Sequence, residues 1–185
     1  VFIVIVSSFS GRWPFFVCLS EGLLRACAPS SLLQAAASAA LAQGLESLRD
    51  RWGAALLVDL HSMPPLKRAQ NGAPPAEFVV GDRFGASCDG MLTARALRYF
   101  GAAERPAAHN RPYAGGYVLD RHGAPARGIH AMQLEICRSA YLDPRMEQLS
   151  ARAGAVAKLL AGLVRDLAGE VAAMGREGSM PLAAE

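Results

Sequence analysis

Apolar residues along the chain follow two periods, one typical of helices and one typical of strands. Before Gly53, four apolar residues are spaced by four, three and four positions: Leu41, Leu45, Leu48 and Trp52. This spacing predicts one face of an amphipathic helix that ends at the glycine. The nearly continuous apolar run 54–60 follows at once and is typical of a strand covered on both faces. A helix leading into such a strand favours a parallel or mixed α/β sheet.

A second buried strand is predicted over residues 131–137, where apolar and polar positions alternate. The apolar positions are Met132, Leu134 and Ile136. Because successive side chains of a strand point to opposite faces, Gln133 and Glu135 should share the other face.

Shorter signals predict the elements between these two strands. Residues 78–80 are interpreted as a short strand, and Asp89 as the N-cap of a helix that ends near Gly101. Glycines in the segment 110–118 let the backbone approach a neighbour closely, so this segment is interpreted as a loop that opens into a strand.

The last predicted element is a long amphipathic C-terminal helix. Asp143 is its expected cap, Pro144 occupies the first helical position, and the apolar stripe continues to Met174. We expect this stripe to be core.

Composition indicates one globular domain of 185 residues, of which 52% are hydrophobic. With 19 basic and 16 acidic side chains and no basic block, no nucleic-acid partner is expected. The apolar run 1–6 is too short for a membrane span and lacks a preceding cationic segment, so neither a membrane partner nor a targeting segment is predicted. Four cysteines without a C-x-x-C pair predict reduced, buried thiols and a cytoplasmic protein: Cys18, Cys27, Cys88 and Cys137.

Charge divides the chain near residue 38. Residues 1–37 hold three charged side chains, Arg12, Glu21 and Arg25, whereas residues 38–185 hold the rest. Two interpretations of this atypical N-terminal segment stay open. It is either a hairpin or strand that packs on the domain, or sequence foreign to the fold.

Two residues on the predicted strands are candidates for chemistry. His61 comes at the carboxyl end of the first strand, where open α/β sheets bind ligands, and Asp59 on the same face would fix which imidazole nitrogen binds metal. A structural histidine is the alternative. Glu135 is a carboxylate within an apolar strand, where desolvation raises the pKa toward that of a useful general base. Its alternative is an ion pair with Arg138 or another arginine.

Arg111 lies in the predicted loop and would bind a substrate carboxylate in bidentate geometry, unless it is an ordinary solvated arginine. The chain has no G-x-S-x-G, no glycine-rich phosphate loop, no Rossmann fingerprint and no H-E-x-x-H. Serine hydrolases of that type, P-loop enzymes and dinucleotide binders are therefore excluded.

Four blocks of the sequence, in this order, resemble the N-formylglutamate amidohydrolase family. They are VDLHSMP from Val58, GDRFGASC from Gly81, NRPYAGGY from Asn110 and QLEICRSAYLD from Gln133. The resemblance covers the later half of a typical member. It implies a three-layer α/β sandwich with a mixed, mainly parallel sheet, of the phosphorylase/hydrolase-like kind found in zinc carboxypeptidases and aspartoacylases. It also implies a zinc-dependent hydrolase that splits N-formyl-L-glutamate into formate and glutamate in histidine breakdown.

The resemblance implies specific roles for the residues of these blocks. His61 resembles a zinc ligand, Glu135 resembles the general base that takes a proton from metal-bound water, and Asp59 and Gln133 support them. The residues matched to the substrate and its carboxylates are Asn110, Arg111, Tyr113, Arg83 and Arg138.

The chain departs from the family pattern before His61. Members usually open with a Pro-His-Ser-Gly segment and an acidic residue that supply the first metal ligands, whereas His61 is the first histidine here. We therefore expect residues 38–185 to form a partial amidohydrolase domain, a fragment whose activity is impaired. Two alternatives remain: a non-catalytic remnant that binds a carboxylate ligand or a partner, and an amidohydrolase for another N-acyl amino acid. The sequence does not predict the oligomeric state.

Overall fold

A mixed five-stranded sheet, in the order β1-β2-β5-β3-β4, forms the centre of the part of the chain that the computed structural model describes, residues 2–6, 31–68 and 74–178. Three of its four pairings are parallel, and the β5–β3 pairing is antiparallel. The strands are β1 (Phe2–Val6), β2 (Ala55–Met63), β3 (Phe78–Gly81), β4 (Ala107–His109) and β5 (Ile129–Cys137). The helices are α1 (Ser31–Trp52), α2 (Gly90–Ala102), α3 (Tyr117–His122) and α4 (Ala153–Gly178), with 3₁₀ turns at Pro125–Arg127 and Arg138–Ala140.

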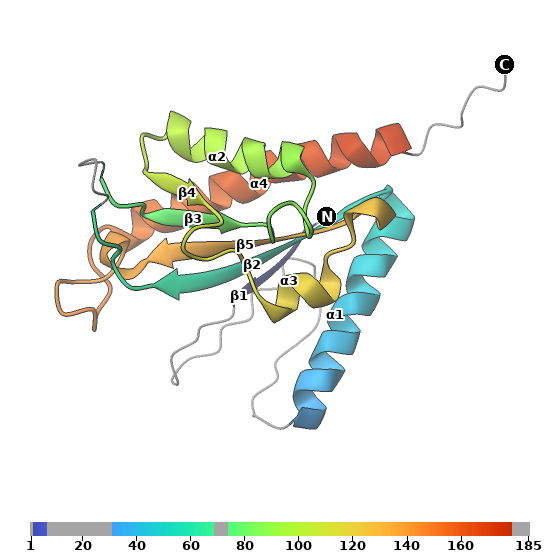
Figure 1. The fold of residues 1–185 in the computed structure, drawn as a ribbon, viewed down its shortest axis with the longest axis horizontal. Helices are drawn as coiled ribbons and strands as arrows, with labels where there is room; N and C mark the ends of the chain where they lie inside the picture. The colour runs from blue at the N-terminus through green and yellow to red at the C-terminus, as the bar shows by residue number, and fades with distance from the viewer. Residues whose placement is uncertain (1, 7–30, 69–73, 179–185) are drawn as a thin grey trace, which may run out of the picture.

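Helices cover both faces of the sheet. The pair α2 and α4 packs on one face, and α1 and α3 lie on the other (Figure 1). The apolar side chains of β2 divide accordingly, because Leu56 and Val58 pack with α2 and α4, whereas Leu57 packs with Leu45 of α1 and Leu119 of α3. The structure thus confirms the predicted three-layer α/β sandwich with a mixed, mainly parallel sheet.

Glycines allow α1 and α4 to approach closely at one end of the sheet. Gly53 follows α1 with φ +81°, and its N–H donates to the Arg49 carbonyl (2.7 Å). A Cβ at Gly53 would collide with the backbone of Gly175 in α4. The predicted end of this helix is confirmed, although α1 begins at Ser31, before the change in charge at residue 38.

The prediction of a strand after residue 116 is wrong. Residues Tyr117–His122 form the short helix α3, whose Leu119 is fully buried. Gly115 precedes it with φ +95°, a left-handed conformation that turns the chain instead of extending it. Burial of Leu119 against α1 and the sheet then outweighs the strand propensity of Tyr117 and Val118.

The C-terminal helix begins later than predicted, at Ala153 and not at Pro144. The Asp143 carboxylate accepts the backbone N–H groups of Glu147 (2.9 Å) and Gln148 (3.3 Å), which closes a loop wider than a helix N-cap. Met146, with φ +60°, interrupts the helical backbone within that loop. The apolar stripe after Ala153 is core, as predicted.

The end of β2 and the state of the cysteines can also be compared with the sequence predictions. Strand β2 continues through His61 to Met63 and ends before Pro64. His61 therefore lies two residues before the end of the strand. Cys88 and Cys137 are buried free thiols, whereas Cys18 and Cys27 lie outside the described residues. No helix in the described part of the chain is long and apolar enough to cross a membrane.

We predict that Phe100→Ala lowers the free energy of unfolding by about 3–5 kcal/mol, because it removes a fully buried aromatic side chain. Phe100 stacks on Phe78 with ring centroids 4.4 Å apart, between α2 and the sheet. Phe84→Ala is the matched control, since Phe84 is 69% exposed and should change stability by less than about 0.5 kcal/mol. Urea unfolding followed by circular dichroism measures both, and equal losses would contradict this placement of the core.

Candidate active site

Four polar side chains share one face of β2 and β5, at the carboxyl half of both strands. The parallel register aligns Asp59 with Gln133 and His61 with Glu135. All four alternate with core residues and point to the α1 side of the sheet, as the sequence pattern predicted for Gln133 and Glu135. We call these four residues the polar quartet.

Asp59 orients the imidazole of His61. The carboxylate is 1% exposed, and its Oδ2 lies 2.8 Å from Nε2 of His61. Burial lowers the pKa of His61, but the hydrogen bond to Asp59 and the charges of Asp59 and Glu135 outweigh burial and raise the pKa above its usual value. The predicted contact between Asp59 and His61 is therefore present, and it uses Nε2.

Glu135 is a buried carboxylate held by a neighbouring amide. Nε2 of Gln133 donates to Oε1 of Glu135 (2.8 Å), and both side chains are at least nine-tenths buried. Burial raises the pKa of Glu135, and the His61 charge and the Gln133 hydrogen bond offset this only in part. No arginine in the described part of the chain forms an ion pair with Glu135, so the alternative of a Glu135–Arg138 pair is not observed.

A loop crosses the sheet beside the polar quartet. Gly81 is paired with Gln133, and a Cβ at Gly81 would lie 2.7 Å from the backbone of Ala114, so the loop rests directly on β3. Tyr113 of this loop packs in an apolar cluster with Met63, Val79 and Cys137. Figure 1 shows the same segment running from β4 across the sheet to α3.

The predicted substrate-binding residues of this region differ in what they contact. Arg111 is exposed and forms no ion pair with a described residue. Arg83 instead pairs with Asp120 (2.6 Å) and also reaches the Gly115 carbonyl. Asn110 is 5% exposed and exchanges hydrogen bonds with Asp82 through both atoms of its amide.

Arg138 follows β5 directly. Its Nε is buried and has no hydrogen-bond partner among the described residues. A buried, unsatisfied guanidinium nitrogen is costly, and such an atom is commonly satisfied by a ligand or a water. Arg138 and Arg111 are thus the two candidate arginines that form no ion pair with a carboxylate of the described residues.

Asp82 is a residue of this region that sequence patterns alone do not identify. It lies at the end of β3 and joins β3, β4 and α2 through hydrogen bonds. Its position in the GDRFGASC block was the one sequence feature that could have drawn attention to it. Of its side-chain partners only Gly85 is near in sequence, so the sequence pattern does not predict its contacts.

The described residues do not supply all the ligands of the zinc site that the resemblance implies. No three His, Cys, Asp or Glu side chains among the described residues are grouped so that they could hold a metal ion. The other three histidines are engaged elsewhere: His109 with Asp82, His122 with Ser38, and His130 with the Asp89 N–H. The described residues therefore do not by themselves form a catalytic zinc site with three protein ligands.

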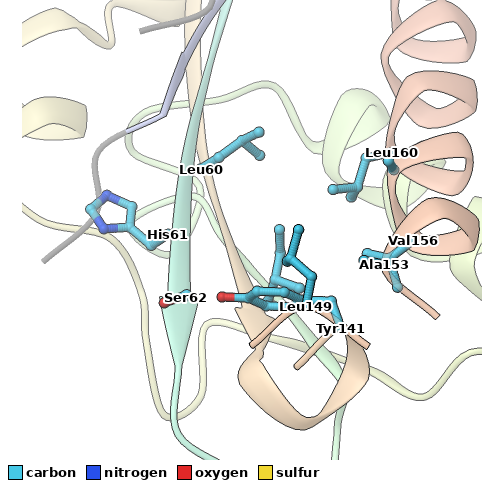
Figure 2. Close-up of a pocket in the computed structure, with 10 residues that line it drawn as sticks. Leu60, His61, Ser62, Tyr141, Leu149, Ala153, Val156 and Leu160 are labelled. Atoms are coloured by element: carbon cyan, nitrogen blue, oxygen red, sulfur yellow. The ribbon is translucent and has the colours of Figure 1, made fainter. Parts of the chain in front are cut away.

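A separate apolar pocket of about 400 Å³ lies on the α4 side of the sheet. Its lining includes Leu60, Tyr141, Leu149, Val156 and Leu160. Figure 2 shows Leu60 pointing into this pocket toward α4, whereas the His61 ring points away from it across β2. His61 is among the residues that line the pocket, but its ring lies on the other face of β2.

Comparisons with known proteins agree with this architecture. A crystal structure of N-formylglutamate amidohydrolase from Ralstonia eutropha JMP134 superimposes with a TM-score of 0.58 and 29% identity, over 76% of this chain and 50% of that one. The N-formylglutamate deformylase of Pseudomonas aeruginosa is 34% identical over 140 residues, 74% of this chain and 51% of its own. That of Pseudomonas putida is 37% identical over 106 residues, 56% of this chain and 39% of its own.

The fold and these similarities define the class of the protein as an α/β amidohydrolase. The family model of N-formylglutamate amidohydrolase matches residues 38–142, more than half of the chain. The chain belongs to the N-formylglutamate amidohydrolase family, and it spans about half the length of the curated relatives it matches.

We predict that Glu135→Gln raises the free energy of unfolding by about 1 kcal/mol at pH 7, because it removes a buried charge that no arginine of the described residues offsets. The raised pKa means that the folded protein binds more protons than the unfolded chain above the unfolded value of about 4.3. The wild type therefore loses stability as pH rises through the folded pKa, and the advantage of the variant should grow from pH 4 to pH 7.

Glu77→Gln is the matched control for this measurement. Glu77 pairs with Arg105 and is partly exposed, so the same substitution should lower stability by less than about 1 kcal/mol. Urea unfolding at several pH values measures both variants. A Glu135→Gln variant that is less stable than the wild type at pH 7 would show that the carboxylate has a structural role.

Proposed function

We propose that this chain carries the general base and the substrate-binding part of a hydrolase that converts N-formyl-L-glutamate and water into formate and L-glutamate. The observation that carries the proposal is Glu135, a buried carboxylate held by Gln133 and unpaired with any described arginine. The names of the two Pseudomonas relatives, both N-formylglutamate deformylases, support the substrate. The buried free thiols Cys88 and Cys137 support a cytoplasmic location.

Glu135 is proposed to move the proton in this reaction. The carboxylate accepts a proton from water as the water oxygen bonds to the formyl carbon. It then returns a proton to the amide nitrogen as the carbon–nitrogen bond breaks, which leaves formate and the free amino group. Burial brings the pKa of Glu135 closer to neutral pH, where a general base is most effective. The hydrogen bond from Gln133 fixes the direction of one carboxylate oxygen.

Two arginines are proposed to bind the two carboxylates of the substrate. Arg111 comes from the loop that crosses β3, and Arg138 follows Glu135 by three residues at the end of β5. A guanidinium binds a carboxylate through two parallel hydrogen bonds, which suits a dicarboxylate such as N-formylglutamate. Tyr113 is proposed to line the same site, and Arg83 and Asn110 to support the loop through their contacts with Asp120 and Asp82.

Zinc is the ion that the family resemblance implies, and His61 is its proposed ligand among the described residues. Since these residues supply no complete set, the remaining ligands would lie outside them. We expect zinc to bind weakly to the 185-residue chain.

We predict that the chain releases formate from N-formyl-L-glutamate when zinc is present in excess. Glu135→Gln should lower the rate at least about 100-fold, because general-base catalysis contributes factors of that size. Glu77→Gln should keep the wild-type rate, since the Glu77 side chain pairs with Arg105 and forms no hydrogen bond or ion pair with the polar quartet among the described contacts. Formate is measured with a coupled formate dehydrogenase assay, in parallel with N-formyl-aspartate and N-formyl-glycine.

Each outcome distinguishes the proposed activity from its alternatives. Undiminished activity in Glu135→Gln would reject the assigned role. Faster hydrolysis of formyl-aspartate or formyl-glycine would indicate an amidohydrolase for another N-acyl amino acid. Binding of N-formyl-L-glutamate without release of formate would indicate a non-catalytic remnant, the alternative that the incomplete metal set favours.

We predict that the purified chain retains well below one zinc per molecule after dialysis against trace zinc, as measured by elemental analysis. The polar quartet has a single imidazole, and the described residues form no group of three ligands, so they do not hold catalytic zinc tightly. One zinc per chain that is lost in His61→Ala would contradict this prediction, and it would show that residues outside the described ones complete the site.

A further inference from the structure

Asp82 is a buried carboxylate that joins three elements outside the polar quartet. Its side chain is 3% exposed. Oδ1 accepts from Nδ2 of Asn110 (2.7 Å) and from the Gly85 N–H (3.0 Å). Oδ2 accepts from Oγ1 of Thr93 in α2 (2.9 Å) and lies 2.9 Å from Nε2 of His109 in β4. The backbone N–H of Asp82 also donates to Oδ1 of Asn110 (2.9 Å), so the two side chains are bound reciprocally.

Asn110 is the point where the chain changes faces of the sheet. His109, one residue earlier, contacts Asp82 and thus lies toward α2. Tyr113, three residues later, packs on Val79 and Met63 on the α1 side. Between them Asn110 has φ +59°, a left-handed conformation that asparagine adopts more readily than most non-glycine residues because its short polar side chain can form hydrogen bonds nearby. Its side chain is held by the two hydrogen bonds with Asp82 and by a contact of Nδ2 with Nε2 of His109 (2.9 Å), and its backbone N–H donates to the Val80 carbonyl (2.8 Å).

The turn at Asn110 determines where the next residues lie relative to Glu135. Val79 is the register partner of Glu135, and Tyr113 packs against the apolar cluster that includes Val79. Arg111 lies between Asn110 and Tyr113, so its backbone is fixed at both ends. If Asn110 were released, the loop would remain tethered by Tyr113 and by Ala114 on Gly81, but Arg111 would lose its fixed starting point.

We propose that Asp82 is a positioning residue for substrate recognition, which acts through Asn110 to hold Arg111 and Tyr113 beside Glu135. The inference rests on the proposed function for the identity of the ligand. On this proposal Asp82, which lies on the opposite face of the sheet from the polar quartet, also determines how well the substrate binds.

The charge state of Asp82 agrees with this role. Burial raises the pKa of Asp82, but hydrogen bonds from Asn110, His109, Gly85 and Thr93 outweigh burial and lower the pKa below its usual value. Asp82 is therefore ionised at neutral pH, and its hydrogen bonds to the turn are charge-assisted. An asparagine at this position keeps the shape but has one acceptor oxygen fewer.

The test compares Asp82→Asn with Asp166→Asn in the 185-residue chain. Asp166 pairs with Arg95 between α2 and α4 (2.7 Å), so its loss is a control for an Asp→Asn change that removes an ion pair away from the turn. Hydrogen–deuterium exchange of the segment 110–117, without ligand, measures how well the loop is held. Isothermal titration calorimetry with N-formyl-L-glutamate measures binding.

We expect Asp82→Asn to increase exchange in the segment 110–117 at least about 10-fold and to weaken binding at least about 10-fold. Asp166→Asn should change neither by more than about twofold. Where turnover is measurable, KM should rise in Asp82→Asn while kcat stays within about twofold, because Glu135 is untouched. Unchanged exchange and binding in Asp82→Asn would overturn the inference, as would equal effects in Asp166→Asn.

The two proposals fail in different ways. A wild-type chain that does not bind N-formyl-L-glutamate, with faster exchange in Asp82→Asn, would overturn the proposed function and keep the positioning of the loop. If Asp82→Asn does not fold, Asn110→Gly replaces it in the exchange measurement, since glycine accepts φ +59° and lacks the side chain that contacts Asp82 and His109. Unchanged exchange in Asn110→Gly would then overturn the inference.

Discussion

The parallel pairing of β2 with β5 is the constraint on which the candidate site depends. The pairing aligns Asp59 with Gln133 and His61 with Glu135, and alternation along each strand sends all four side chains to the α1 side of the sheet. A slip of one residue would exchange these polar groups with Leu60, Leu134 and their neighbours, which form the core under α2 and α4. Burial of that core therefore fixes the register of the site, and no contact within the site has to do so.

The polar quartet places charge in the interior of the sheet. Asp59 and Glu135 are buried carboxylates on adjacent strands, and the charges of both act on His61. Both carboxylates favour the charged form of His61 and raise its pKa. Burial disfavours the charged form of Glu135, and His61 and Gln133 offset this only in part, so the pKa of Glu135 also rises. A buried carboxylate that has no arginine partner among the described residues is better explained by a role in catalysis than by a contribution to stability.

The sequence predicted those parts of the fold and the site that depend on local periodicity. The alternation of 131–137 was sufficient to place Gln133 and Glu135 together, and the apolar run before His61 identified β2. It did not predict α3, because Leu119 is buried by α1 and the sheet, partners that are distant in sequence. It also missed the role of Asp82, since Asn110, 28 residues away, becomes its partner only when β3 and β4 pair. Tertiary contacts, and not propensity, decide both cases.

The strands and the loops of this site have different physical roles. Glu135 and His61 lie on paired strands, where the core on the opposite face holds their backbone, and the proposed substrate-binding residues Arg111 and Tyr113 lie on a loop. A loop has no ladder of hydrogen bonds, so its geometry depends on a few side chains such as Asp82 and on close backbone contact at Gly81. The position of the proposed base is therefore held by the strands themselves, whereas the positions of Arg111 and Tyr113 depend on the buried Asp82 on the other side of the sheet together with the backbone contact at Gly81.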